Sequence, residues 1–380
     1  MKVIKGGVST AKGFKANGLS AGIKRSGKPD LGLIYSDILA CGACLFTLNS
    51  VKAAPVIVSQ KHIRNGKAQA FIVNSGNANC FTGKFGLMYA ERTTETFGKL
   101  LNIPKENVIV SSTGIIGVPL PYKKIEKAAK SLVVGLSPTG GQKVAKSILT
   151  TDLIQKECCV EITIGGKRVT IGGCSKGSGM IAPNMATMLA FITTDAAISS
   201  KMLKAALKQA NDQSFNCISV DGCMSTNDMV AIMANGLAKN KTISATGKDF
   251  NTFTSALSYV CLELAKKIVI DGEGATKFIE IHVDGAKTQK QAREVGLKVA
   301  DSNLVKTAAF GSDPNWGRVC AAVGSVGIKN VTDQRLKINF SSFAKKEIRI
   351  NIDLGIGKSK AVVYTSDLSH DYIRINVAYN

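Results

Sequence analysis

The chain has 380 residues, of which 45% are hydrophobic and 20% are charged, and its formal net charge is +22. This length predicts about two domains or one large intertwined unit with a sizeable core. The 37 glycines beside only 8 prolines indicate tight turns and close backbone approaches, which excludes a low-complexity linker.

The predicted elements mix helices and strands along the whole chain. Apolar residues recur at helical spacing in 121–136, 197–215 and 250–269, and a serine pair at 199–200 suits the cap of the second helix. Strand-like runs, several of them alternating with period two, occupy 68–76, 106–113, 158–166, 188–196, 277–285, 336–340, 347–355, 360–368 and 372–379. The pattern predicts an α+β fold whose strands concentrate toward the C-terminus.

The positive charge raises the question of a nucleic-acid partner. No helix-turn-helix, zinc-finger or aromatic RNA-binding signature is present, and the lysines are scattered along the sequence. We therefore expect a solvated lysine-rich surface and no nucleic-acid partner. Such a surface would also favour an anionic substrate.

The sequence shows neither a targeting segment nor a membrane span. The N-terminal residues lack the apolar stretch of a signal peptide, and runs such as MVAIMANGLA are too short to cross a bilayer. We therefore expect a cytoplasmic protein with no membrane partner.

The ten cysteines are irregularly spaced, which suits reduced, buried residues. Cys41 and Cys44 form a CxxC pair, but no second pair and no histidines at ligand spacing accompany them, so we expect no metal site.

The common catalytic motifs are missing. A hydrolase triad needs a histidine beside a nucleophile, and His62, His282 and His370 all lie in ordinary surroundings. Neither a GxxxxGK[ST] phosphate loop nor a GxGxxG turn after a strand occurs, which disfavours a nucleotide-dependent enzyme.

The remaining possibility is a nucleophilic residue whose own α-amine acts as its base. In SKGSGMIAPNMATMLAFITTDA, residues 175–196, an Ala-Thr pair stands where the sequence becomes strand-like. If the Ala186–Thr187 bond is cut, the new amine of Thr187, with an ordinary pKa of about 8, can activate the threonine hydroxyl. From these residues by themselves, a threonine at the start of a strand explains the pair better than a cleavage site does.

The same stretch resembles the processing site of the ornithine acetyltransferase family, the glutamate N-acetyltransferases that are the J enzymes of arginine biosynthesis. Further segments resemble this family in the same order over almost the whole chain, and KTAAFGSDPNWGR is the most specific of them. These segments are 6–24, 51–59, 74–83, 111–121, 214–222, 225–228, 271–277, 302–318 and 371–376.

The resemblance implies an αββα-type sandwich, a fold shared with a few aminopeptidases. It implies a proenzyme that cuts itself between Ala186 and Thr187 into an α chain, 1–186, and a β chain, 187–380, which form one intertwined unit and assemble as an α2β2 heterotetramer. Thr187 would take acetyl from N-acetylornithine and then give it to glutamate in a ping-pong reaction.

The resemblance also assigns roles to individual residues. Thr113 and Gly114 would form the oxyanion hole. Lys176 would pair with a substrate carboxylate, and Glu273 would face the ammonium or amide end of the substrate. The residues expected to bind substrate are Thr150, Lys176, Thr187, Glu273 and Asn376. Without the resemblance, each would be read as an ordinary turn or surface residue.

The chain departs from the family pattern at three places. Leu153 and Gln155 interrupt the usual TTDT-x-P-K run, and Cys223 and Met224 stand before STND, which puts the polar contacts of that loop in doubt. The sequence given ends at Asn380, one residue short of a usual Thr or Ser, so we expect weaker substrate binding.

Two matters stay open at this level. No cofactor is expected, but the sequence does not decide whether acetyl-CoA also serves as an acetyl donor. An N-terminal-nucleophile aminopeptidase or amidase on the same scaffold, and an uncleaved binding protein without chemistry, are the alternative functions.

Overall fold

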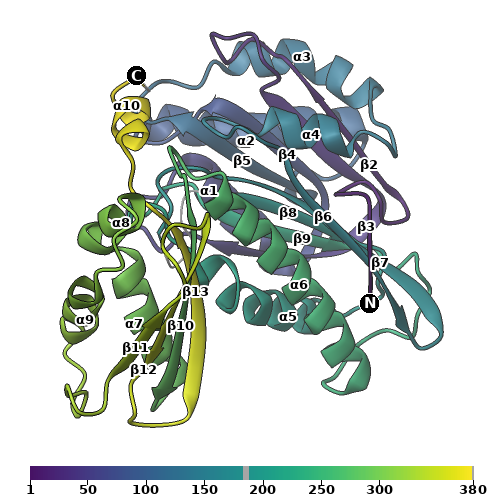
Figure 1. The fold of residues 1–380 in the computed structure, drawn as a ribbon. Coiled ribbons are helices and arrows are strands. Elements are labelled where there is room, and N and C mark those ends of the chain that lie inside the picture. Colours follow the sequence, from purple (N-terminus) through teal and green to yellow (C-terminus); the bar gives the residue numbers. More distant parts are fainter. Residues whose placement is uncertain (183–187, 379–380) are drawn as a thin grey trace.

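The computed structural model describes residues 1–182 and 188–378. The expected cleavage residues Ala186 and Thr187, and Asn380, lie outside this range. The body of the molecule is built in four layers, helices, sheet, sheet and helices, with a smaller sheet and its helices beside them (Figure 1). The expected α+β fold of αββα type is therefore confirmed.

One nine-stranded sheet supplies both inner layers. Its order is β1-β6-β7-β8-β9-β3-β4-β5, with β2 paired to β3. The strands are β1 (Lys2–Ile4), β2 (Phe14–Leu19), β3 (Leu31–Phe46), β4 (Lys67–Asn77), β5 (Val108–Ile115), β6 (Lys156–Ile164), β7 (Lys167–Lys176), β8 (Leu189–Thr194) and β9 (Met229–Ala234).

The long strand β3 joins the two layers. Its first part pairs with β2 and β4 and its last part, 41–46, pairs with β9, with a register shift between Tyr35 and Ala40. The sheet thereby folds over on itself, and an apolar core fills the space between its halves. Phe71 of β4 and Phe191 of β8 meet there, with ring centroids 5.7 Å apart.

Helices cover both outer faces of the folded sheet. α6 packs on β6 and β7 with α5 beside it, while α1, α2 and α3 cover the half that contains β4 and β5, and α4 packs on β2 (Figure 1). The helices of this body are α1 (Ala54–His62), α2 (Gly83–Leu101), α3 (Tyr122–Val134), α4 (Gly141–Ser147), α5 (Ser200–Asp212) and α6 (Lys248–Ile270).

The predicted helix 197–215 shows how local sequence fixes these boundaries. It begins at Ser200 because the Ser199 side chain caps it by accepting the N–H of Met202. Its apolar residues, including Leu203 and Leu207, recur at helical spacing and are buried against the sheet.

The smaller sheet follows α6 and has the order β11-β12-β10-β13. Ile279, Ile281 and Val283 of β10 alternate with more exposed residues and are fully buried under helices on one face. The elements of this part are β10 (Phe278–Ala286), α7 (Gln289–Ala300), α8 (Asn303–Phe310), α9 (Trp316–Gly324), β11 (Lys337–Phe340), β12 (Glu347–Asp353) and β13 (Ser359–Ser366).

The strand predicted at 372–379 is wrong, because this segment forms helix α10 (His370–Ala378). Ser369 accepts the N–H of Asp371 at the start of the helix. Ile373 and Val377 fit a period of two, but they are also four residues apart, and both are exposed on the helix. Because the segment has no buried face, its apolar pattern does not distinguish a strand from a helix.

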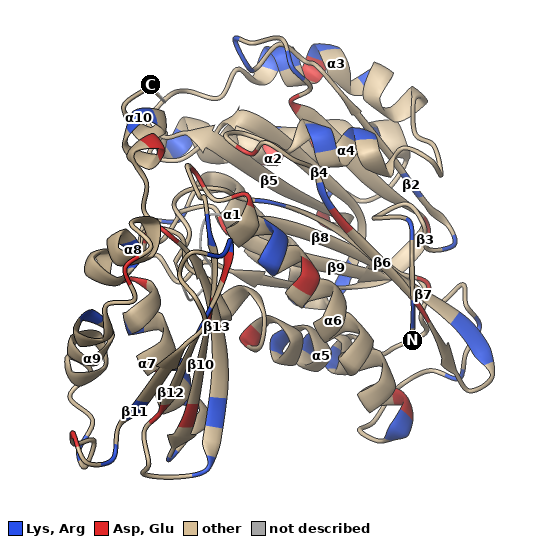
Figure 2. Cartoon of the chain, in the orientation of Figure 1, with Lys and Arg blue, Asp and Glu red and all other residues tan. Residues whose placement is uncertain are grey.

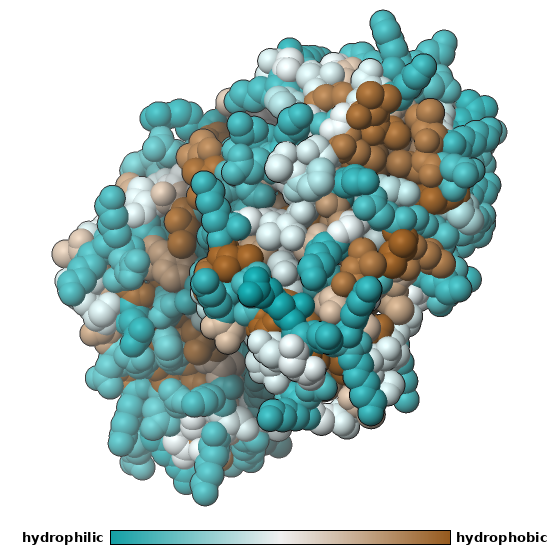
Figure 3. Space-filling model, turned by 90° about the vertical axis from the view of Figure 1, so that its right-hand side faces the viewer, coloured by the Kyte–Doolittle hydropathy of each residue, from teal (hydrophilic) through white to brown (hydrophobic). Residues whose placement is uncertain are grey.

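The surface is charged and mixed. Figure 2 shows Lys and Arg distributed over every layer of the ribbon. Figure 3 shows one face on which hydrophobic patches stand between hydrophilic side chains. Within the described residues, no helix has the length and apolar character needed to span a membrane.

Candidate active site

Six of the residues predicted for the site line one small cavity of about 100 Å³. They arrive from five separate segments: the end of β5, the loop before β6, the end of β7, the loop after α6, and α10. The six are Thr113, Gly114, Thr150, Lys176, Glu273 and Asn376.

The end of β5 reaches the cavity through a very close backbone contact. β5 runs parallel to β4, and Gly114 lies beside Gly76. Gly114 has φ 135°, and a Cβ there would lie 2.3 Å from the carbonyl carbon of Gly76. Glycine is therefore required at position 114. This approach sets the buried Thr113 at the cavity wall.

Lys176 is a buried cation at the end of β7. Its side chain is inside the protein, and its Nζ donates to Thr113 Oγ1 over 3.2 Å. Burial lowers the pKa of Lys176, while the carboxylates of Asp152, Asp228 and Glu273 act in the opposite direction. An ammonium placed at a cavity wall in this way can bind a carboxylate that enters the cavity.

Glu273 and Asn376 meet on another wall. Asn376 of α10 donates to Glu273 Oε2 over 2.8 Å, and the N–H of Glu273 donates to the carbonyl of Ser178. A Cβ at Gly179 would lie 2.2 Å from the Glu273 carboxylate. The glycine of the KGSGM run therefore allows this carboxylate to lie against the cavity.

A buried ionic trio holds the loop that carries Thr150. Lys156 Nζ lies 2.7 Å from Asp152 Oδ1 and 2.5 Å from Asp271 Oδ2, and all three side chains are shielded from solvent. Asp152 also accepts the N–H groups of Thr150 and Gly177. The trio thus ties together the segments that deliver Thr150, Lys176 and Glu273.

Sequence reasoning missed the role of this trio. Asp152 and Lys156 belong to the TTD…K run and Asp271 to DGEG, so the signal was present in the residues already quoted. The departure at Leu153 is harmless to the trio, because the backbone N–H of Leu153 binds Asp271 and the side chain is 86% exposed.

Two neighbouring lysines determine the charge of Asp152. Burial acts to raise the pKa of its carboxyl, but Lys176, Lys156 and the N–H of Gly177 outweigh burial and lower this pKa to about 2. Asp152 therefore stays ionised under all ordinary conditions and stabilises the two neighbouring lysine charges.

Both flanks of the expected cleavage segment are held by carboxyl groups. The N–H groups of Met180 and Ile181 donate to Asp221, and the N–H of Met188 donates to Asp228 Oδ1 over 2.9 Å. Gly179 and Met180 line the cavity itself. The chain on either side of 183–187 is thus anchored beside the six gathered residues.

The departures at Cys223 and Met224 leave these anchors intact. Cys223 is exposed and its N–H donates to Asp221, while the Met224 carbonyl accepts from Asn49. The loop uses its backbone for these contacts, so the changed side chains do not disturb Asp221 or Asp228.

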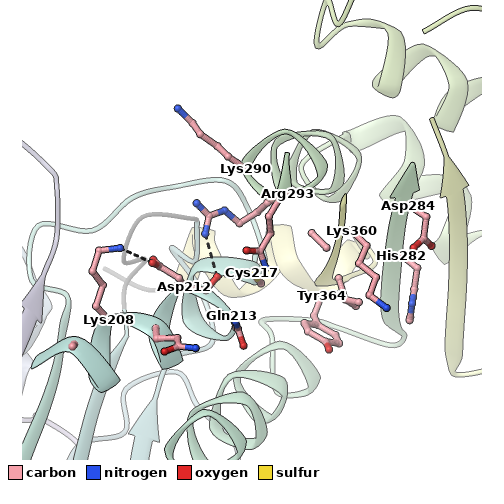
Figure 4. A pocket seen from close by; sticks show the side chains of 15 residues that line it. Lys208, Asp212, Gln213, Cys217, His282, Asp284, Lys290, Arg293, Lys360 and Tyr364 are labelled. Atoms are coloured by element: carbon pink, nitrogen blue, oxygen red, sulfur yellow. Dashed lines mark hydrogen bonds and ion pairs between the residues drawn. The ribbon is translucent and has the colours of Figure 1, made fainter. Parts of the chain in front are cut away.

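A much larger hollow, of about 1080 Å³, lies between α5, α7, β10 and β13. Figure 4 shows Lys208, Arg293 and Lys360 around it, with Lys208 paired to Asp212 and Arg293 donating to the Asp212 carbonyl. Among the described residues, none of those predicted for the site lines this hollow.

Comparisons with known proteins show similarity to one family over nearly the whole chain. A model of the ArgJ family matches residues 15–344 and 341–380. The chain is 44% identical to the arginine biosynthesis bifunctional protein ArgJ of Gloeobacter violaceus, over 99% of this chain and 98% of that protein. It is 45% identical to the ArgJ protein of Caldanaerobacter subterraneus subsp. tengcongensis, with both chains fully covered.

Solved structures are similar over part of the chain. A crystal structure of the Bacillus halodurans ArgJ protein is 43% identical, with a TM-score of 0.47, and covers 49% of this chain and 97% of that one. The Mycobacterium tuberculosis ornithine acetyltransferase complexed with ornithine is 35% identical, with a TM-score of 0.45, and covers 48% of this chain and 97% of that one.

Proposed function

The chain belongs to the ArgJ family, and on that premise we propose that it transfers acetyl from N2-acetyl-L-ornithine to L-glutamate with Thr187 as nucleophile. The observation that carries this proposal is the meeting of six predicted residues, from five segments, around one cavity. The relatives named ArgJ are acyltransferases of arginine biosynthesis, and this chain is an enzyme of that class.

Maturation comes first in the proposed sequence. The Thr187 hydroxyl attacks the carbonyl carbon of Ala186, the peptide bond shifts to an ester, and water hydrolyses the ester. The products are a carboxylate at Ala186 and a free amine at Thr187. The amine then serves as the general base for its own hydroxyl.

Acetyl transfer then takes two half-reactions. Thr187 attacks the acetyl carbon of N-acetylornithine, ornithine leaves with the proton, and an acetyl ester forms on Thr187. The neutral amine of glutamate attacks this ester, the bond between the acetyl carbon and the Thr187 oxygen breaks, a proton from the amine returns to that oxygen, and N-acetylglutamate leaves. Thr113 and Gly114 are proposed to stabilise the oxyanion in both halves, because preorganised donors are most effective in a water-poor site.

Substrate recognition follows from the charges on the cavity walls. N-acetylornithine and glutamate share an α-carboxylate, for which the buried ammonium of Lys176 is the proposed partner. Glu273, supported by Asn376, is assigned to the ammonium or amide end of the substrate. Thr150 completes the set as a hydroxyl partner on the loop before β6.

Three further features belong to the proposal. Acetyl recycling is the core activity, and the bifunctional names of the relatives support an added test with acetyl-CoA as donor. Chains 1–186 and 187–380 assemble as an α2β2 heterotetramer. The protein works in the cytoplasm without a cofactor.

The first test is intact mass spectrometry of the purified protein beside Thr187→Ala. Two fragments that meet at Ala186 and Thr187, and that are lost in the variant, are the expected result. Uncut wild-type protein would overturn the proposed mechanism and favour a binding protein without chemistry.

An assay of the cut protein separates the enzymatic alternatives. Acetylglutamate formed from N-acetylornithine and glutamate supports the transferase. Release of free acetate with no transfer to glutamate would support an amidase instead. A parallel assay with acetyl-CoA and glutamate, without N-acetylornithine, decides the second donor.

A further inference from the structure

Asp228 is a buried carboxyl group that the proposed reaction has not yet used. It stands directly before β9, and Met188 stands directly before β8. These strands are parallel neighbours with Leu189 opposite Met229, so their first residues are aligned. The alignment lets Asp228 Oδ1 accept the N–H of Met188, the residue bonded to Thr187.

The second oxygen of this carboxyl has no partner among the described residues. Asp228 is 1% exposed, and its Oδ2 is buried without a hydrogen bond. The Thr47 hydroxyl lies beside it but donates to the Ser225 carbonyl, and Ser225 Oγ, also beside it, accepts the N–H of Asn227 and makes no hydrogen bond to Oδ2. Buried polar atoms in proteins are nearly always paired, so an unpaired carboxyl oxygen here calls for a ligand.

Covalent geometry limits what that ligand can be. The backbone nitrogen of Thr187 is three bonds from the nitrogen of Met188, a span of less than about 4 Å in any conformation. The amine that cleavage would create is therefore tethered within a few ångströms of the amide that Asp228 already holds.

We propose that Asp228 is a positioning residue that binds the Met188 amide through Oδ1 and the newly formed amine of Thr187 through Oδ2. This inference rests on the proposed function and extends it to the residue that orients the base. A carboxyl that only anchored the strand would need Oδ1 and not Oδ2.

The electrostatics agree with a partner that appears on cleavage. Burial raises the pKa of Asp228 well above its ordinary value, while Lys176 of β7 is the charged side chain that lowers it. In the uncut chain the carboxyl therefore keeps its proton more readily, which avoids an unpaired buried charge. A new amine nearby allows the pair to share that proton.

The test compares Asp228→Asn with wild type. Asparagine keeps the shape and an acceptor for the Met188 N–H but replaces Oδ2 by an NH2 group. Because the amine does not exist in the uncut chain, cleavage, followed by intact mass against time, should stay within about twofold of wild type. In the matured variant we expect kcat for acetyl transfer to fall about tenfold, with KM for N-acetylornithine within about twofold.

The pH profile separates positioning from a merely structural role. A nearby carboxylate raises the pKa of an amine, so its removal lowers that pKa by about one unit. Because the base must be neutral, the acid limb of the kcat profile should move to lower pH by the same amount. An Asp228→Asn protein whose acid limb does not move would overturn the inference.

Asp195→Asn is the matched control. Asp195 is equally buried, follows the far end of β8, and binds backbone N–H groups of Thr170 and Lys12. Its replacement should leave cleavage and the position of the acid limb unchanged. If Asp195→Asn moves the limb as far as Asp228→Asn does, the effect is structural and the inference fails.

A measurement on wild type covers the case in which Asp228→Asn does not fold. The rate of acylation of the Thr187 amine, followed by mass spectrometry of chain 187–380 over a pH series, gives its pKa. A value above the ordinary 7.7–8 supports the inference, and a value at or below it overturns the inference. Uncut wild-type protein would instead refute the proposed function itself, before any Asp228 variant is made.

Discussion

Two of the hollows formed by the described residues differ in size and in the state of their charges. The larger one, about 1080 Å³, is rimmed by lysines such as Lys208, which is 70% exposed. The smaller one, about 100 Å³, is walled by the buried Lys176 and Glu273 and supported by the fully buried Lys156. Exposed charges cost little to keep, whereas buried charges are expensive, so the smaller hollow is the one shaped for chemistry.

The largest effect should come from breaking the ionic trio under the small cavity. Lys156→Met keeps the volume but leaves the carboxylates of Asp152 and Asp271 buried together without the lysine that pairs with both. We expect a loss of about 3–5 kcal/mol in the free energy of unfolding, measured by denaturant titration. Lys360→Met at the large hollow is the control and should change stability by less than about 0.5 kcal/mol. Equal losses in the free energy of unfolding would show that the lysines at the two hollows contribute equally to stability.

The next largest effect concerns the cation that faces the cavity. Lys176→Met removes the proposed partner of the substrate carboxylate, and a hydrogen bond between charged groups contributes about 1.5–3 kcal/mol. We therefore expect kcat/KM for N-acetylornithine to fall by about 10- to 100-fold. The fold should survive, because a buried ammonium is removed together with its desolvation cost. Wild-type kcat/KM in a folded variant would argue against this role.

Acid titration tests the carboxylate of the trio. The folded-state pKa of Asp152 is about 2, below its ordinary value of 3.8, so its ionised form stabilises the fold above pH 3.8. That contribution, about 2 kcal/mol by the size of the shift, should be lost as the pH falls toward 2. Unfolding curves of wild type and Asp152→Asn should therefore converge at low pH. If the difference in the free energy of unfolding between wild type and Asp152→Asn stays constant from pH 6 to pH 2, the ionised carboxylate is not the source of this stability.

A smaller effect should follow from one methyl group at the cavity wall. Gly179→Ala places a Cβ against the Glu273 carboxylate, which must move away from its position. We expect KM for N-acetylornithine to rise about tenfold, the result of losing about 1.4 kcal/mol of binding. Gly324→Ala, at the end of α9 with open space around it, is the matched control and should leave KM unchanged.

The smallest effect is expected at the large hollow. Lys208→Gln combined with Lys360→Gln removes two positive charges from its rim, and exposed charges contribute little. Acetyl transfer should stay within about twofold of wild type in steady-state assays. A tenfold loss would show that the larger hollow takes part in the reaction, so the two hollows would not differ in function.

Much of the fold was predictable because its signals are local. The buried face of 197–215 and the alternation in 277–285 identify a helix and a strand directly. Segment 372–379 failed because α10 has no buried face, so the apolar period carried no information. The sharing of β3 between two sheet layers, and the glycine-rich β7, depend on distant partners that a local pattern does not contain.

The site, like the fold, combines features that local sequence predicts with features that depend on distant residues. Family-like motifs identified the six residues around the cavity, but they did not show which groups hold them there. Lys156 reads in sequence as one more surface lysine, and its two carboxylate partners include Asp271, 115 positions away. Asp228 was hidden for the same reason, since its contact with Met188 depends on the alignment of β8 with β9.

The pairing of β7 with β8 affects how the protein could refold after cleavage. Lys176, before the expected cut, lies opposite Leu189, after it, in one antiparallel ladder. If the chain is cut as proposed, the native contacts persist, but unfolding releases two polymers in place of one and gains their separate translational freedom. Refolding then begins with a bimolecular encounter. After cleavage, an unfolded enzyme could refold only once its two chains had met again. The active enzyme would therefore last as long as the two chains stay associated.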